Sequence, residues 1–317
     1  MKHSLQVLLI FLGLFVVSQF IGLFLIFSSS DVVVGFDEES DREVTEVVFS
    51  NTSVGERPDI EGSQTLLAIA FGVFFGTVVL LLLSKFNKVN IWKHWFFFAS
   101  IITMSVSFGV IFNNFLFAWV LAFVLGVWKV YRSNTLIHNL TELFIYPGIA
   151  LLIAPLLNVF YAFLLLVLIS IYDAYAVWKS KHMVTMAKFA RGANLFPGLA
   201  VSYNKKTGSL VNKKREAPSS KKSSSKRKSD VVTGILGGGD IAFPLIFSSV
   251  FLIFLLEQGF SGWIAFIYAF IISLFAGVAL LLLFLFGKKD RFYPAMPFIS
   301  AGCFLGYLFV LLLLNIF

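Results

Sequence analysis

The chain has 317 residues, of which 58% are hydrophobic and 13% are charged, with a formal net charge of +8. A soluble domain carries about 25% charged residues, so the composition excludes an ordinary globular protein and predicts one that is embedded in a lipid bilayer. The single cysteine, Cys303, excludes an internal disulfide framework and a multi-cysteine metal site, and the four histidines show no ligand spacing.

The apolar segments, taken in chain order, predict nine membrane-spanning helices. A hydrocarbon core about 30 Å thick needs roughly 20 apolar residues in a helix. The candidate spans are residues 5–27, 65–84, 92–111, 115–131, 136–153, 156–178, 231–255, 262–286 and 294–317. The first is longer than the core of a signal peptide, so we interpret it as a retained helix. We therefore expect an all-α polytopic membrane protein with nine transmembrane helices.

The loops between these spans alternate in charge. Ten acidic residues and only two arginines lie between the first and second spans. Lysine and arginine follow the second, fourth, sixth and eighth spans, whereas the loops after the third, fifth and seventh spans hold almost none. By the positive-inside rule, the sequence predicts a multi-pass protein of the cell membrane with a cytoplasmic N-terminus and an external C-terminus.

One connection is much longer than the others. Residues 179–230 carry 14 of the 25 lysines and arginines, and the part after about residue 204 is rich in serine and lysine, which predicts disorder. We interpret it as a solvated cytoplasmic linker, with contact to anionic lipids as the alternative. Because most of the excess charge lies here, nucleic acid is not an expected partner. The chain thus divides into residues 1–178, 179–230 and 231–317.

Only two acidic residues lie clearly inside apolar segments, since Glu142 is expected to reach the membrane interface. At 1.5 Å per residue, Asp173 lies about 7.5 Å from residue 178 and Asp240 about 13 Å from residue 231. Both of these ends are expected to be cytoplasmic, on consecutive spans. We therefore expect the two carboxyl groups to face each other at similar depth, and ionisable groups at such depth indicate a functional site.

Two facing carboxyl groups are expected to share one proton. In the aspartic-protease arrangement, one carboxylate takes a proton from water while its protonated partner polarises the scissile carbonyl, without a metal. A proton or ion relay in a channel or transporter uses the same two groups, and the acids alone do not decide between these functions.

Glycines and prolines flank the two acids. The run Gly237-Gly238-Gly239 precedes Asp240 and lets another backbone approach closely. The segment 293–297 holds two prolines, which predicts irregular backbone on which an extended substrate pairs, or else an ordinary helix start. Elsewhere, two glycine pairs fit the GxxxG pattern of helix packing: Gly72 with Gly76, and Gly302 with Gly306.

Three short motifs together resemble a known family. Tyr172-Asp173, Gly237-x-Gly239-Asp240 and Pro294-Ala295-Met296 are similar to the YD, GxGD and PAL motifs of the presenilin and signal peptide peptidase family of intramembrane aspartyl proteases. The order and the predicted helices match those of the family, and residues 181–197 resemble the segment that follows YD in archaeal members. Met296 stands where the family has leucine.

The resemblance implies a role for each motif. Asp173 and Asp240 would be the catalytic pair, with Tyr172 beside the first. Gly237 and Gly239 would shape the backbone of the site, and Pro294, Ala295 and Met296 would line the substrate.

The implied activity is hydrolysis of peptide bonds within transmembrane segments of other membrane proteins, with no cofactor and no metal. The partners would then be transmembrane-helix substrates and the lipid bilayer. The alternatives are an ion or proton channel or transporter, a prepilin-peptidase-type GxGD protease, and a metal-dependent lipid-phosphate transferase.

Overall fold

A computed structural model describes residues 5–37, 42–58, 60, 62–132, 134–180, 186, 189–190, 195–204, 231–287 and 293–314. The long helices of these residues are α1 (Leu5–Ser29), α2 (Gly62–Lys85), α3 (Val89–Phe112), α4 (Phe115–Tyr131), α5 (Thr135–Ile153), α6 (Val159–Ala174), α8 (Gly239–Glu257), α9 (Gly262–Phe286) and α10 (Met296–Leu314). A 3-10 turn (Ala154–Leu156) precedes α6 and a π-helical turn (Tyr175–Lys179) follows it. Two hairpins complete the fold: β1 (Ser30–Asp37) with β2 (Arg42–Phe49), and β3 (Gly198–Asn204) with β4 (Val231–Gly237).

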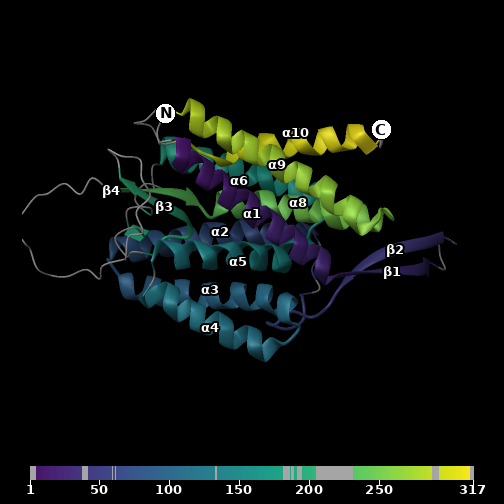
Figure 1. Ribbon diagram of the computed structural model, residues 1–317, viewed down its shortest axis with the longest axis horizontal. Coiled ribbons are helices and arrows are strands. Elements are labelled where there is room, and N and C mark those ends of the chain that lie inside the picture. Colours follow the sequence, from purple (N-terminus) through teal and green to yellow (C-terminus); the bar gives the residue numbers. More distant parts are fainter. Residues whose placement is uncertain are drawn as a thin grey trace, which may run out of the picture.

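The helices form the bundle that the apolar segments predicted. Eight are long and apolar enough to cross a membrane, and α4, with 17 residues, is a shorter apolar helix. Successive helices run in opposite directions, so that β1 and β2 project from one end of the bundle and β3 and β4 lie at the other (Figure 1). Within the described residues, the all-α polytopic architecture with nine apolar helices is confirmed.

The predicted seventh span is wrong in its first part. Residues 231–237 form β4, which pairs antiparallel with β3 from Gly198↔Gly237 to Asn204↔Val231, and the helix α8 begins only at Gly239. The reason is local composition: Val231, Val232 and Thr233 favour a strand, and the following glycines disfavour a helix. The prediction of disorder after residue 204 lies outside the described residues.

The acidic segment after the first span also holds structure that the sequence did not indicate. β1 continues directly from α1 and pairs with β2 from Ser30↔Phe49 to Asp37↔Arg42. Valines on both strands favour the hairpin. The many acidic residues among them made this strand-forming composition hard to recognise from the sequence.

The helices differ greatly in burial. α8 lies at the centre of the bundle, in contact with α1, α5, α6, α9 and α10, and most of its residues are buried. α2 lies at the edge, touching α3 and α6, and its most apolar stretch has no buried residue. The helix α8, whose first turn holds Asp240, is therefore enclosed by protein, whereas α2 presents its apolar side chains outward.

One of the two GxxxG pairs packs as expected. A Cβ on Gly302 would lie 2.7 Å from Ala279 Cβ, and one on Gly306 would lie 2.9 Å from Ile272 Cα, so both glycines let α10 approach α9 closely. Among the described residues, nothing lies within 4 Å of such a Cβ on Gly72 or Gly76. The packing prediction is therefore confirmed for α10 and wrong for α2.

This contrast predicts different effects of the same substitution. Gly302→Val is expected to destabilise the protein by about 1–3 kcal/mol, because the added methyl groups overpack the α9–α10 interface. The measurement is thermal unfolding in detergent. Gly76→Val is the matched control on α2 and is expected to leave the melting temperature unchanged; equal losses in both variants would contradict the packing role of Gly302.

Candidate active site

Asp173 lies in the last turn of α6 and is buried, with 7% of its surface exposed. Its Oδ2 accepts a hydrogen bond from the backbone N–H of Met296, at 3.1 Å. The π-helical turn that follows α6 is a rare conformation that often occurs at functional sites. Two of the three sequence motifs, YD and the proline-containing motif, thus meet at the Asp173 carboxyl group.

The proline-containing motif explains why this amide is available. Residues 293–295 are irregular and α10 begins at Met296, so that the carbonyl of Ala295 accepts the amides of Phe298 and Ile299, each at 3.1 Å. The first amides of a helix have no partner within it, and the N–H of Met296 is one of them. Pro294 and Met296 are buried and Ala295 is partly buried.

Asp240 lies in the first turn of α8 and is partly buried. The expected position, deep within a helix that starts at residue 231, is wrong because β4 occupies the first seven residues of that segment. A Cβ on Gly237 would lie 3.0 Å from Oδ2 of Asp240, so this carboxyl group folds back over the end of β4.

The two aspartates come from neighbouring helices. α6 packs against α8, and the carboxyl groups of Asp173 and Asp240 are close enough to interact electrostatically. The structure therefore brings together the two acids that the sequence singled out, one at the end of α6 and the other at the start of α8.

The three glycines before Asp240 differ in how tightly they are packed. A Cβ on Gly238 would lie 3.1 Å from the ring and hydroxyl of Tyr146, and the N–H of Gly238 donates to the carbonyl of Pro197 at 3.2 Å. A Cβ on Gly239 would make only an ordinary contact, 3.4 Å from Phe243. The tightly packed positions are therefore Gly237, against the Asp240 carboxyl group, and Gly238, against Tyr146, whereas the motif indicated Gly237 and Gly239.

Tyr172 connects the site to α2. Its hydroxyl forms a hydrogen bond of 2.6 Å with Oγ1 of Thr77, on α2. On the other side of α6, the hydroxyl of Ser170 donates to that of Ser300 on α10, at 2.8 Å. Nothing in the sequence indicated Thr77, Ser170 or Ser300, because single hydroxyl residues in apolar helices are common and their partners lie far away in the chain.

A third polar contact holds the start of α8. The side-chain amide of Gln19, on α1, donates to the carbonyl of Ile241 at 2.9 Å, and its oxygen accepts a hydrogen bond from Ser273, on α9, at 3.1 Å. The residue after Asp240 is thus tied to two other helices by a buried amide.

Metal ligands are not gathered at this site. Across the described part of the chain, no group of three or more histidine, cysteine, aspartate or glutamate side chains is arranged to hold a metal ion.

Comparisons with known proteins identify a family and a similar fold. The family model described as signal-peptide peptidase, presenilin aspartyl protease matches residues 50–316. Two solved structures of a presenilin family intramembrane aspartate protease, in space groups C222 and P2, each share 16% sequence identity with this chain. The match to the first structure covers 96% of this chain and 99% of the chain in that structure, with a TM-score of 0.59. The match to the second covers 96% of this chain and 96% of the chain in that structure, with a TM-score of 0.56. A comparison with curated proteins finds no match.

Proposed function

The chain belongs to the signal peptide peptidase and presenilin family of aspartyl proteases, and we propose that Asp173 and Asp240 are its catalytic pair. At the level of the family, it is an intramembrane aspartyl protease. The observation that carries the proposal is the meeting of the three motifs: Asp173 accepts the amide of Met296, and it interacts electrostatically with Asp240, which lies directly after the glycine run.

The proposed reaction is hydrolysis by water with one proton shared between the two carboxyl groups. The ionised carboxylate takes a proton from water, and the resulting hydroxide attacks the carbonyl carbon of the scissile bond. The protonated partner gives its proton to the carbonyl oxygen, forming a gem-diol. On collapse of the diol, the carboxyl group that took the proton from water gives it to the leaving nitrogen, and the other carboxylate takes a proton from a diol hydroxyl. The C–N bond breaks, a carboxylic acid and an amine are released, and the pair returns to its starting state.

The substrate is proposed to be a transmembrane segment that is unwound near the site. Among the described residues, β3 is the one strand that pairs with β4, and the outer side of β3 is taken at Ala200 by the side chain of Asn139. The free edge of β4 therefore suits an extended peptide, which would add as a third strand just before Asp240.

The surroundings of the protein are proposed from the charge pattern. On the β3–β4 side, the last turns of α2 and α4 carry Lys85 and Lys129, and the π-helical turn after α6 ends at Lys179. This charge favours a cytoplasmic location for that side and a cytoplasmic N-terminus. The basic segment 179–230 suits anionic lipids on the same side.

The test is reconstitution of the purified chain in liposomes with a tagged single-span substrate. Cleavage within the span is expected, with full activity in a metal chelator and inhibition by a transition-state isostere of peptide hydrolysis. Loss of activity in the chelator would point to a metal-dependent enzyme. Ion flux without any cleavage would favour the channel or transporter.

A further inference from the structure

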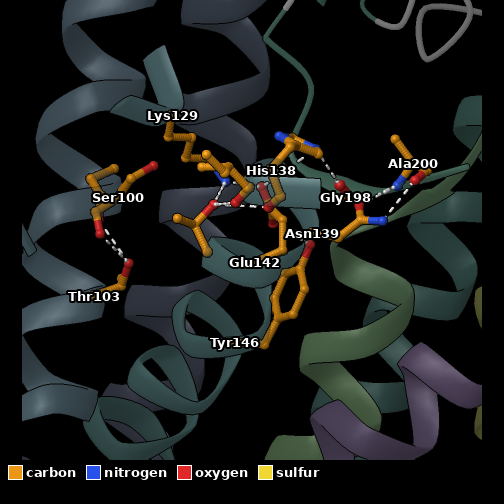
Figure 2. Close-up of polar contacts among 12 residues, drawn as sticks. Ser100, Thr103, Lys129, His138, Asn139, Glu142, Tyr146, Gly198 and Ala200 are labelled. Atoms are coloured by element: carbon orange, nitrogen blue, oxygen red, sulfur yellow. Dashed lines mark hydrogen bonds and ion pairs between the residues drawn. The ribbon is translucent and has the colours of Figure 1, made fainter. Parts of the chain in front are cut away.

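A buried cluster of charged and polar side chains lies on α5. Nζ of Lys129, from α4, is 2.6 Å from Oε1 of Glu142, and the two side chains are 0% and 1% exposed. The hydroxyl of Tyr146 donates to the other carboxylate oxygen of Glu142. The expectation that Glu142 reaches the membrane interface is therefore wrong, since its carboxylate is enclosed by partners from α4 and α5 (Figure 2).

A contribution to stability does not by itself explain why this buried ion pair is present. Removing two charges from water is expensive, and a buried ion pair often stabilises a protein no better than apolar residues of the same volume. Here the ammonium also donates to Oγ1 of Thr141 at 3.0 Å, and both carboxylate oxygens accept hydrogen bonds. The cluster is thus well satisfied, which fixes the side-chain geometry along one face of α5.

The same face of α5 holds strand β3. Nε2 of His138 is 2.8 Å from the carbonyl oxygen of Gly198. The side-chain amide of Asn139 donates to the carbonyl of Ala200 at 2.8 Å and accepts from its N–H at 2.9 Å, as a neighbouring strand would (Figure 2). The start of β3 is therefore fastened to α5 at two of its first three residues.

Strand β3 in turn places the glycine run. Gly198 pairs with Gly237, only three residues before Asp240, and the N–H of Gly238 donates to the carbonyl of Pro197. Tyr146 lies against Gly238 and is close enough to Asp240 to interact with it electrostatically. The base of the hairpin and the start of α8 thus rest on the face of α5 that carries the buried cluster.

We propose that His138, Asn139, Glu142 and Tyr146 are positioning residues, which form a platform on α5. The platform holds the β3–β4 hairpin in place, and the hairpin sets the position of Asp240. The ion pair with Lys129 fixes Glu142 within the platform. The inference rests on the proposed function, because it assumes that Asp240 is catalytic. In an active site, a displacement of about 1 Å reduces turnover by about a hundredfold.

Two variants test the platform without leaving a buried charge unpaired. Asn139→Leu removes both hydrogen bonds to Ala200, and Tyr146→Phe removes the hydroxyl but leaves the ion pair intact. Each is expected to lower kcat for a tagged transmembrane substrate by about tenfold to a hundredfold, with KM changed less than about twofold. Ser107→Ala is the matched control, since Ser107, on α3, donates to the carbonyl of Phe144, on α5, at 2.6 Å rather than to a residue of β3. Its kcat is expected to stay at the wild-type value.

Hydrogen exchange provides a second measurement that needs no cleavage. Peptides covering residues 195–204 and 231–239 are expected to exchange faster in Asn139→Leu and in Tyr146→Phe than in the wild type or Ser107→Ala. Wild-type kcat in both variants, or a loss of kcat in the control as large as theirs, would overturn the inference. So would unchanged exchange of the hairpin. If the wild type itself cleaves nothing, the proposed function fails, and exchange alone decides whether the platform holds the hairpin.

Discussion

Replacing either Asp173 or Asp240 by asparagine is expected to reduce cleavage within the substrate span by about a thousandfold or more. Asparagine keeps the shape of the side chain but neither takes a proton from water nor gives one to the carbonyl oxygen. Because one group must be ionised and the other protonated, the loss of either is expected to remove the same activity, and the double variant to be no worse than the singles. The measurement is product formation in liposomes by mass spectrometry of the cut peptide.

The asparagine variants are expected to fold, which separates chemistry from stability. The Oδ1 atom of asparagine at position 173 can still accept the amide of Met296, so the melting temperature is expected to stay close to that of the wild type. Glu257→Gln, at the exposed far end of α8, is the control for loss of an acid from the same helix and is expected to retain full activity. More than a tenth of the wild-type rate in either aspartate variant would show that the pair is not the catalyst.

Gly198→Ala is expected to lower both activity and stability. Gly198 has a φ of +148°, which L side chains rarely adopt, and an added Cβ would overlap the carbonyl oxygen of Leu236 on β4. The backbone strain alone amounts to about 1–3 kcal/mol. Opening the hairpin at this pair displaces Gly237 and the start of α8, so cleavage is expected to fall by about tenfold to a hundredfold.

Gly55→Ala is the matched control for that variant. Gly55 also has a positive φ, +119°, but no atom of the described residues lies within 4 Å of its added Cβ. It follows the β1–β2 hairpin, at the other end of the bundle. It therefore carries the conformational strain without the collision and is expected to lose some stability but no activity. A similar loss of cleavage in both variants would mean that the effect of Gly198→Ala is global rather than transmitted through β4.

Much of the architecture follows from the sequence alone. Apolar length is a local property, so each span is indicated by its own residues, and the ends of α4 and α9 match the predicted segments 115–131 and 262–286. The two aspartates were found in the same way, because an acid within an apolar segment stands out without any knowledge of its neighbours.

The start of α8 depended on pairing between distant parts of the chain. Residues 231–237 are apolar enough to continue a helix, but β3 lies about thirty residues earlier in the sequence and offers them hydrogen-bond partners. A strand pair is formed by contacts between segments, so its existence cannot be judged from either segment by itself. Because of this pairing, Asp240 lies in the first turn of α8 and not in the interior of a helix, where it was expected.

Burial was likewise decided by the tertiary structure. Lys129 and Glu142 are thirteen residues apart, near the ends of two apolar segments where charged side chains usually reach water. Only the packing of α4 against α5 buries both side chains and brings Nζ of Lys129 to 2.6 Å from Oε1 of Glu142. Gly72 and Gly302 show the same limit: both belong to identical spacing patterns, but only Gly302 has another helix against it. The sequence by itself determined which segments enter the membrane and which acids they carry; the tertiary structure decided which of their faces meet, because contact depends on residues far apart in the chain.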